Sequence, residues 1–241
     1  MKNILLLFIL GSAGLIILPS CHNHWKSGNG KITVEDRPVG PFNTITVEGL
    51  FPVEITQNGE KESVHVETDQ NLQCMITVRT DGKDLYIKTT NDESFGNSTK
   101  TKVYINIKNL TELDFKSVGA LNTKGILKLD SLTVNSESVG KLNLNLDAKY
   151  LHANLSSVGA STLTGKVNEA RINNKSVGSL SAFDLKAGTM MIHNTALGIT
   201  EVYADSAFYI RSSSVGALFY KGPGQLKELK SEGIGVVQKK D

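Results

Sequence analysis

The chain has 241 residues, enough for one large domain or two small ones. Charged residues make up 21% of it and the formal net charge is +2, so the composition lacks the basic excess typical of nucleic-acid binders. Hydrophobic residues reach 39%, enough for a core, and the two cysteines are too few for a disulfide framework.

The N-terminus has the pattern of a secretory signal peptide. An apolar run from Ile4 to Leu18 is shorter than the roughly 20 residues that a membrane span needs. It ends in Leu18-Pro19-Ser20-Cys21, which resembles the cleavage box of bacterial lipoproteins, where the cysteine is lipidated and becomes the mature N-terminus. We therefore predict a lipoprotein signal peptide at residues 1–20, lipidation of Cys21 and a tether at residues 21–30. The alternative is an ordinary signal peptide cut elsewhere, and Cys74 is expected to be a small buried side chain.

Residues 31–108 have the pattern of short strands without a fixed repeat. Apolar and polar residues alternate, as in half-buried strands, in six segments: 43–47, 52–56, 63–67, 75–78, 85–88 and 102–107. Asn58-Gly59 and Asp81-Gly82 are turn signals, and the second predicts a hairpin. We expect these irregular β coils to cap the first edge of the regular structure that follows.

A triplet of serine, valine and glycine recurs along residues 109–237. Five complete copies are centred on Val118, Val139, Val158, Val177 and Val215, and two degenerate copies on Leu197 and Ile234. The glycines are separated by 21, 19, 19, 20, 18 and 19 residues. A unit of this length buries its apolar face only by stacking on the next copy, so the spacing predicts a parallel β-solenoid with about 19–21 residues per coil.

Counting from the centre of each triplet separates a core face from an outer face. Apolar residues recur three and five positions after the centre, and seven and five positions before it, as alternation within strands requires. The residues five positions before the centre are Leu113, Val134, Ala153, Ile172, Ile192, Ile210 and Leu229. We also expect the central Val158 to point into the core, so that Val158→Asp prevents folding.

The serines form a column at a glycine corner, where their hydroxyls can bond the backbone. A catalytic serine needs one base and one acid at a single place. Five equivalent serines therefore predict a structural role.

Two outward rows carry the residues that are able to bind a partner. One row contains Thr133, His152, Arg171, Met191 and Tyr209, and the row two positions on contains Asn135, Asn154, Asn173, His193 and Arg211. From these rows we select the candidate surface-binding residues Asn135, Asn154, Asn173, Arg171, Tyr209 and Arg211. Such side chains can bind a glycan or a protein by hydrogen bonds and stacking. The alternative is an asparagine ladder that keeps the rod soluble.

The sequence contains no recognisable set of catalytic or metal-binding residues. Asp130, Asp147, Asp184 and Asp205 stand at different offsets from their triplets, and His65, His152 and His193 are equally unaligned. Phosphate loops and zinc spacings are absent. We predict no catalytic residue, no metal site and no cofactor.

Several segments resemble one known family over roughly Gly30 to Val237. They are Gly28-Asn29-Gly30, residues 41–49, residues 53–57, residues 81–85 and the Ser-Val-Gly coils. The family is the putative auto-transporter adhesin, head GIN domain family, which occurs in lipoproteins and exported proteins of Bacteroidetes-like bacteria. The resemblance implies a right-handed parallel β-helix and an adhesin role, and it supplies no catalytic residues.

These observations predict an all-β protein with one β-helical domain at residues 31–237, irregular at 31–108 and regular at 109–237, and a charged tail at 238–241. The expected function is that of a non-enzymatic cell-envelope lipoprotein, anchored to the outer membrane on its periplasmic or cell-surface face. It would bind a glycan or protein on an outer sheet face, or act as a scaffold, and would not bind nucleic acid. The alternatives are a carbohydrate-active β-helix lyase or hydrolase, and an accessory or sensing lipoprotein of an envelope system. The oligomeric state stays open.

Overall fold

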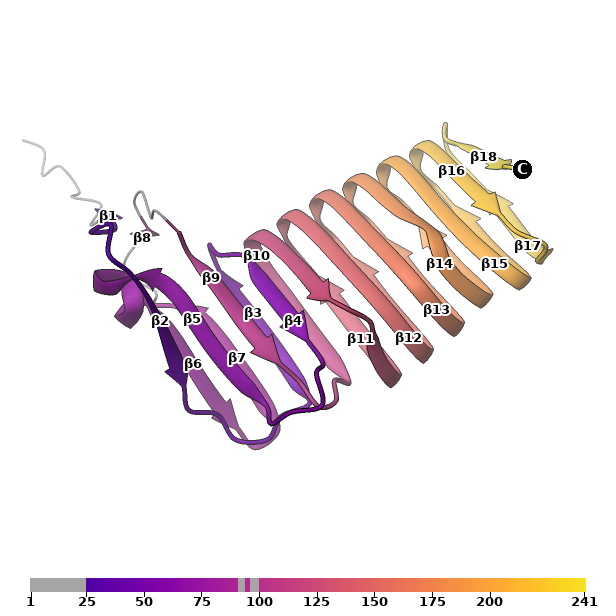
Figure 1. Ribbon diagram of the computed structural model, residues 1–241. Coiled ribbons are helices and arrows are strands. Elements are labelled where there is room, and N and C mark those ends of the chain that lie inside the picture. Colours follow the sequence, from indigo (N-terminus) through magenta and orange to yellow (C-terminus); the bar gives the residue numbers. More distant parts are fainter. Residues whose placement is uncertain (1–24, 91–93, 96–99) are drawn as a thin grey trace, which may run out of the picture.

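The structure is a computed structural model that describes residues 25–90, 94–95 and 100–241. The predicted signal peptide and Cys21 lie outside the described residues, as do residues 21–24 of the tether. The described chain contains strands and one short 3-10 helix, η1 (Gln70–Met75), and sixteen of the strands form a single sheet. Figure 1 shows this sheet wound into a rod, with the coils of the second half following one another towards the C-terminal end.

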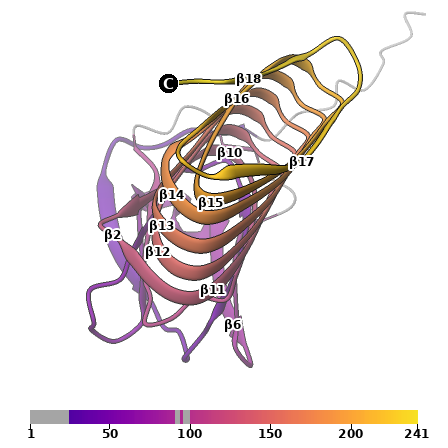
Figure 2. The same cartoon turned by 90° about the vertical axis from the view of Figure 1, so that its right-hand side faces the viewer.

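The second half of the chain forms stacked coils whose strands all pair in parallel. These strands are β10 (Glu112–Lys124), β11 (Leu127–Ser136), β12 (Val139–Leu155), β13 (Val158–Asn174), β14 (Val177–Asn194), β15 (Leu197–Ser212), β16 (Val215–Lys221), β17 (Gln225–Ser231) and β18 (Val236–Lys239). Equivalent triplet residues are in register, because Val139 pairs with Val158 and Val158 pairs with Val177. The coils lie one behind the other when the rod is viewed from its C-terminal side (Figure 2). The parallel β-helix predicted from the repeat is confirmed.

The first half of the chain closes the other end of the rod. Its strands are β1 (Trp25–Lys26), β2 (Ile32–Arg37), β3 (Thr44–Gly49), β4 (Val53–Thr56), β5 (Ser63–Asp69), β6 (Ile76–Asp81), β7 (Asp84–Thr89), β8 (Ser94–Phe95) and β9 (Lys102–Asn106). Strands β3 and β4 continue the parallel pairing from β10, whereas β2, β5 and β6 pair antiparallel with their neighbours. The expected cap is therefore present, and the β6–β7 hairpin turns at Asp81-Gly82 as predicted.

Aliphatic side chains from both halves form one continuous core. The residues predicted to face inward, seven and five positions before the triplet centres, are buried in the middle coils: Leu132, Val134, Leu151, Ala153, Ala170, Ile172, Met190, Ile192, Phe208 and Ile210. Leu229 is an exception with 47% exposure, because no described coil packs over the outer edge of β17.

The central residues of the triplets point outward, which corrects the predicted orientation of Val158. Val158 is 52% exposed, and its equivalents Val118, Val139, Val177, Leu197 and Val215 are also about half exposed. The preceding residue, Ser157, is buried. The prediction was wrong because all the buried offsets are odd numbers, so strict alternation places the centre, an even offset, on the outer face. Geometry outweighs the hydrophobicity of valine at this position.

The buried serines satisfy backbone N–H groups at the corner between consecutive strands. The backbone N–H of Ser138 donates to Ser157 Oγ at 3.3 Å, and that of Ser157 donates to Ser176 Oγ at 3.2 Å. The hydroxyls of Ser157 and Ser176 thus accept a hydrogen bond from the coil before them, at a place where an unpaired N–H would cost roughly 1–3 kcal/mol. The Ser117 hydroxyl donates to the backbone carbonyl of Gly49 at 2.8 Å instead. The structural role predicted for the serine column is confirmed.

One coil has an alanine in the serine column, and a buried asparagine replaces the missing hydroxyl. The acceptor for the N–H of Ser176 would come from position 196, which is Ala196. The N–H of Ser176 instead donates to Asn174 Oδ1 at 3.2 Å. Asn174 Nδ2 in turn donates to Asn194 Oδ1 at 3.0 Å and to Thr200 Oγ1 at 3.1 Å, so its own amide is satisfied. The column remains hydrogen-bonded where the repeat degenerates.

The triplet glycines are required by the close approach of neighbouring coils. Gly159 has a φ of 137°, and a Cβ at this position would lie 2.0 Å from the carbonyl oxygen of Gly140. Both the positive φ and the lack of space exclude a side chain. This explains why glycine recurs in every copy of the triplet.

Cys74 does not have the predicted burial. It is a free, exposed cysteine in η1, where Leu72 and Met75 occupy the inward positions instead. None of the helical structure described for this chain is long and apolar enough to cross a membrane.

Candidate functional site

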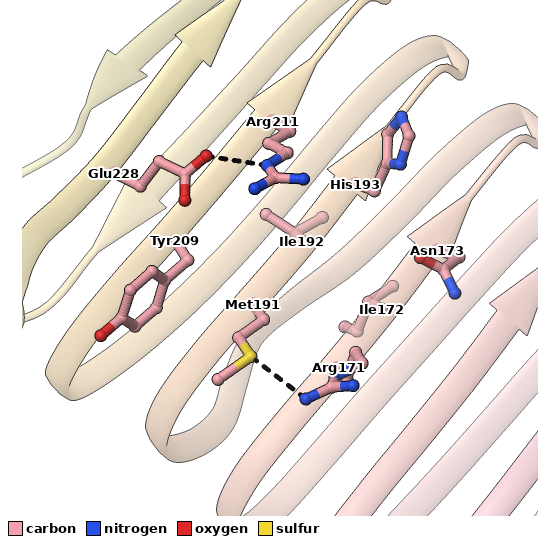
Figure 3. A pocket seen from close by; sticks show the side chains of 9 residues that line it. All are labelled: Arg171, Ile172, Asn173, Met191, Ile192, His193, Tyr209, Arg211 and Glu228. Atoms are coloured by element: carbon pink, nitrogen blue, oxygen red, sulfur yellow. Dashed lines mark hydrogen bonds and ion pairs between the residues drawn. The ribbon is translucent and has the colours of Figure 1, made fainter.

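A depression of about 390 Å³ lies on the outward face of β13, β14, β15 and β17. Four of the six candidate residues line it, namely Arg171, Asn173, Tyr209 and Arg211 (Figure 3). The remaining lining residues are Ile172, Met191, Ile192, His193 and Glu228. We call this group of nine residues the arginine depression.

The parallel register brings the side chains of the depression together in two rows. Arg171 pairs with Met191, which pairs with Tyr209, and Tyr209 pairs with Glu228. The second row contains Asn173, His193 and Arg211 in the same order of strands. Within each row every residue comes from a different coil, so residues about 20 positions apart in the sequence become neighbours across strands.

The two arginines are held by different partners. Arg211 Nε donates to Glu228 Oε1 at 2.8 Å, and within the described structure the two terminal nitrogens of Arg211 have no hydrogen-bond partner. Arg171 Nη2 lies 3.6 Å from Met191 Sδ and 3.5 Å from Glu169 Oε1. Their side chains are 59% and 55% exposed. Both guanidiniums are therefore oriented from one side and open to solvent on the other.

Electrostatics keep the Arg211–Glu228 pair ionised. The hydrogen bond from Arg211 lowers the pKa of the Glu228 carboxyl, and the same bond raises the pKa of Arg211. Lys230 Nζ lies 3.8 Å from Glu228 Oε1 and adds a further positive charge at this edge. The depression presents fixed cations to an incoming ligand.

Asn135, Asn154 and Asn173 form a ladder that satisfies its own amides. Asn154 Nδ2 donates to Asn135 Oδ1 at 2.8 Å, and Asn173 Nδ2 donates to Asn154 Oδ1 at 2.8 Å. Asn135 Nδ2 donates to Asp114 Oδ1 at 2.7 Å. Asn135 and Asn154 lie outside the depression, and their contacts fit the structural alternative raised from the sequence. The structure thus places Arg171, Tyr209 and Arg211 in the depression, Asn135 and Asn154 in the ladder, and Asn173 in both.

Glu228 is the lining residue that sequence reasoning missed. It stands six positions before Ile234, the same offset that Tyr209 has from Val215, so extending the row by one coil would have found it. A register shift between β15 and β17 places Glu228 beside Tyr209, although Leu226 pairs with Phe208. Met191 and His193 were already part of the predicted outward rows.

Two of the four carboxylates considered for catalysis, Asp130 and Asp205, are engaged in exposed surface pairs. Lys149 lies 2.7 Å from Asp130 and lowers the pKa of that carboxyl, which keeps it charged. Tyr203 donates to Asp205 at 2.7 Å. A carboxyl with a lowered pKa is a poor general acid near neutral pH. In the part of the chain that the structure describes, no group of three His, Cys, Asp or Glu side chains could hold a metal ion.

A serine, a histidine and an aspartate are connected on the cap. Ser63 Oγ lies 3.1 Å from His65 Nε2, and His65 Nδ1 lies 2.5 Å from Asp36 Oδ1. This is the connectivity of a catalytic triad. However, β5 pairs with β2 on one side and β9 on the other, so its N–H groups belong to the sheet and are not free to form an oxyanion hole. Asp36 is 84% exposed, and we interpret the three residues as cross-strand polar contacts.

An aliphatic ridge runs along another part of the rod. It consists of the half-exposed triplet centres, and beside it the triplet glycines form the floor of a shallow trough of about 570 Å³. Lys141, Ala160, Ser179 and Ile199 line the far side of the trough. This surface is mostly apolar and has few groups that could orient a polar ligand, so the arginine depression is the better candidate site.

The fold is a parallel β-solenoid, and the arginine depression is open to solvent on the outward face of its sheet. The family described as "putative auto-transporter adhesin, head GIN domain" matches residues 41–224, and the chain belongs to this family. The resemblance stated from the sequence is confirmed. A comparison with curated proteins finds no match.

Solved structures from Bacteroidetes share the fold. A protein of Bacteroides fragilis described as a putative adhesin has 23% identity and a TM-score of 0.84, with 89% of this chain and 100% of that chain covered. A protein of Parabacteroides distasonis described as a putative lipid binding protein has 19% identity and a TM-score of 0.67, with coverages of 88% and 99%. A putative adhesin of the same species has 24% identity and a TM-score of 0.63, with coverages of 90% and 100%. None of these descriptions names an enzyme.

Proposed function

We propose that this protein is an exported, non-enzymatic lipoprotein of the cell envelope that binds a glycan or protein through the arginine depression. The family description supports an adhesin-like role. The signal sequence and Cys21 support a lipid anchor in the outer membrane. The depression lies on β13, β14, β15 and β17, far along the sheet from the N-terminal strands. The rod would therefore hold the depression at a distance from an N-terminal anchor.

The observation that carries the proposal is the convergence of polar and aromatic side chains from four coils. Arg171, Tyr209 and Arg211 share a solvent-open depression, and the terminal nitrogens of Arg211 are available to a ligand. Ile172 and Ile192 border the depression through their backbone, because their side chains are buried in the core. The exposed face offers Met191 as an apolar side chain beside a few oriented polar groups, a combination that is typical of binding sites.

A binding screen with a matched control tests the proposal. The full-length protein, solubilised in detergent, is applied to glycan and extracellular-protein arrays. We expect binding that is lost when Arg171, Tyr209 and Arg211 are changed together to Gln, Ala and Gln. The control is Arg79→Gln, which removes an exposed arginine of the cap and should leave binding unchanged. If the triple variant binds as well as the wild type, the ligand does not bind in the arginine depression and the proposal is wrong.

The anchor is tested separately from the binding. We expect Cys21→Ala to abolish incorporation of labelled fatty acid and to release the protein from the membrane fraction. The control is Cys74→Ala, since Cys74 is the other cysteine of the chain and lies in the cap. Membrane association and lipid labelling of the Cys21→Ala variant would overturn the anchor.

A further inference from the structure

The charges around the arginine depression favour an anionic ligand. Three cations, Arg171, Arg211 and Lys230, face two carboxylates, Glu169 and Glu228. Glu228 accepts a hydrogen bond from Nε of Arg211 and leaves its two terminal nitrogens, which form a planar fork, available. A guanidinium fork binds a carboxylate through two parallel hydrogen bonds, which gives geometric selectivity as well as charge complementarity.

The spacing of the two arginines fits more than one acidic group. Arg171 lies on β13 and Arg211 on β15, with β14 between them. Neighbouring strands are about 4.8 Å apart, so the two backbones are separated by about 10 Å across the sheet. Arg211 also stands one two-residue step further along its strand, which adds about 7 Å in that direction. This separation suits a ligand that carries acidic groups on successive units better than one with a single carboxylate.

The surface between the arginines fits a sugar ring. Met191 and Tyr209 occupy the same row as Arg171, and Tyr209 is 37% exposed. An exposed aromatic face with an apolar neighbour offers a flat platform for the C–H face of a sugar, while His193 and Asn173 can exchange hydrogen bonds with hydroxyls.

A peptide fits this surface less well than a sugar. Extended peptides bind mainly by adding a strand to a free sheet edge, through main-chain hydrogen bonds. The arginine depression lies on the face of the sheet, where β14 pairs with β13 on one side and β15 on the other. Its backbone groups are therefore committed to the ladder, and recognition there relies on side chains.

We infer that the arginine depression binds an acidic glycan, in which carboxylates of nearby sugars occupy the guanidiniums of Arg171 and Arg211 and a sugar ring stacks on Tyr209. The inference rests on the proposed function and specifies its ligand class. The family description and the structural neighbours name no such ligand.

The test compares acids with their neutral esters. Uronate- and sialate-containing oligosaccharides and the methyl esters of the same compounds are titrated against the full-length protein in detergent. We expect at least one acid to bind more than tenfold tighter than its ester, with affinity that falls between 50 and 500 mM salt. Arg211→Gln and Arg171→Gln should each weaken binding of the acid about tenfold, and Tyr209→Ser should weaken acid and ester alike.

The controls separate specific recognition from general attraction to a basic protein. Arg79→Gln removes one positive charge from the cap and should leave the affinity for the acid unchanged. Arg211→Lys keeps the charge but lacks the planar fork of a guanidinium, so its affinity should lie between those of the wild type and Arg211→Gln. These side chains are exposed, so all variants should keep the melting temperature of the wild type.

The outcomes distinguish the ligand class from the proposed function. Equal binding of acids and esters overturns the acidic-glycan inference and leaves the proposed function standing. The same holds if the ligand is a neutral glycan or a protein whose binding is lost when the residues of the depression are changed. An effect of Arg79→Gln as large as that of Arg211→Gln overturns the inference as well. If no acid of the panel binds, the inference fails, and if the arrays also show no ligand for the depression, both fail.

Discussion

The cap and the regular coils satisfy their buried polar groups in different ways. In the cap the partners differ from one position to the next: Gln73 Nε2 donates to the carbonyl oxygens of Thr33 and Val66, and Asn106 Nδ2 donates to that of Lys61. The buried hydroxyl of Thr89 has no hydrogen-bond partner among the described residues. In the coils one residue type repeats, with a serine hydroxyl accepting the N–H of the preceding coil. The comparison shows that stacked equivalent corners reuse one solution in several coils, with Asn174 replacing it where the column has Ala196, whereas a cap of mixed strand directions needs a separate solution at each position.

Glycine substitutions should show the largest difference between the two regions. Gly159→Ala places a Cβ 2.0 Å from a backbone oxygen at a φ of 137°, and we expect it to destabilise the protein by more than about 4 kcal/mol or to prevent folding. Gly59→Ala in the cap has a φ of 79° and open space around it, so only the backbone strain of about 1–2 kcal/mol should remain. Urea unfolding measures both, and similar losses would contradict the tight approach of the coils.

The asparagine that replaces a serine hydroxyl is the next strongest test. Leu155 stands one coil before Asn174 at the equivalent position, so Asn174→Leu is compatible with the space there. We expect this change to cost about 2 kcal/mol, because the N–H of Ser176 and the amides around it lose partners. Adding Ala196→Ser should recover part of the loss by supplying the missing hydroxyl. A double-mutant cycle measures the coupling, and strictly additive effects would refute the replacement.

Substitution of Ser157 should cost more stability than substitution of its neighbour Val158, although valine is the more hydrophobic residue. Ser157→Ala removes the acceptor for the N–H of Ser138, and we expect a loss of about 1–2 kcal/mol. Val158→Asp changes a side chain that is half exposed, so the loss should stay below about 1 kcal/mol. Thermal unfolding of both variants gives the order, and a larger loss for Val158→Asp would restore the inward orientation.

The smallest expected effect is on the pH dependence of stability. It compares the ion pair of Glu67 and Lys100 in the cap, whose carboxylate is mostly buried, with the exposed pair of Asp130 and Lys149 in the coils. Hydrogen bonds from Lys100 and then Tyr104 lower the pKa of Glu67, so this carboxylate stabilises the folded state above its ordinary pKa and the stabilisation is lost as the pH falls. Glu67 in turn raises the pKa of Tyr104 to about 12, so the contribution of the tyrosine is present below pH 10 and lost as the pH rises towards 12.

Glu67→Gln should therefore weaken the fall of the melting temperature between pH 5 and 2, and it should do so even at 0.5 M salt. Its matched control is Asp130→Asn, because Asp130 pairs with Lys149 on the coils and is 85% exposed. Salt screens such an exposed pair, so the effect of Asp130→Asn on the pH profile should vanish at 0.5 M salt. An equal response to salt in both variants would remove the distinction.

Much of the regular half could be predicted from the sequence, because each coil repeats the environment of the last. The glycine spacing predicted the stacking, and alternation predicted the burial of residues such as Ile172 and Phe208. Val158 was misplaced because its hydrophobicity was given more weight than its even offset. In the cap, alternation predicted strands but not their partners. Strand β2 was missed although Ile32 and Val34 alternate with polar residues, because the alternation covers only these two apolar residues, and η1 has no repeated apolar pattern.

Four of the six candidate binding residues meet in the arginine depression, and this too follows from the repeat. Their offsets from the triplets place them in neighbouring rows, so proximity across strands was predictable for Arg171, Tyr209 and Arg211. The hydrogen bonds that the polar side chains of these rows make with one another could not be predicted from the sequence. Asn154 is engaged in the asparagine ladder, and Glu228, which its offset places in the row of Tyr209, accepts a hydrogen bond from Arg211.

The sequence by itself determined the coil length, the parallel register and the division of each coil into an inner and an outer face. It could do so because in-register stacking brings equal residues to equal positions, and side chains alternate along a strand. Only the tertiary structure decided the antiparallel pairing of β2, β5 and β6, and the bulges that shift β14, β15 and β17 against each other. Strand order and bulges depend on contacts between segments far apart in the chain, which the repeat does not specify.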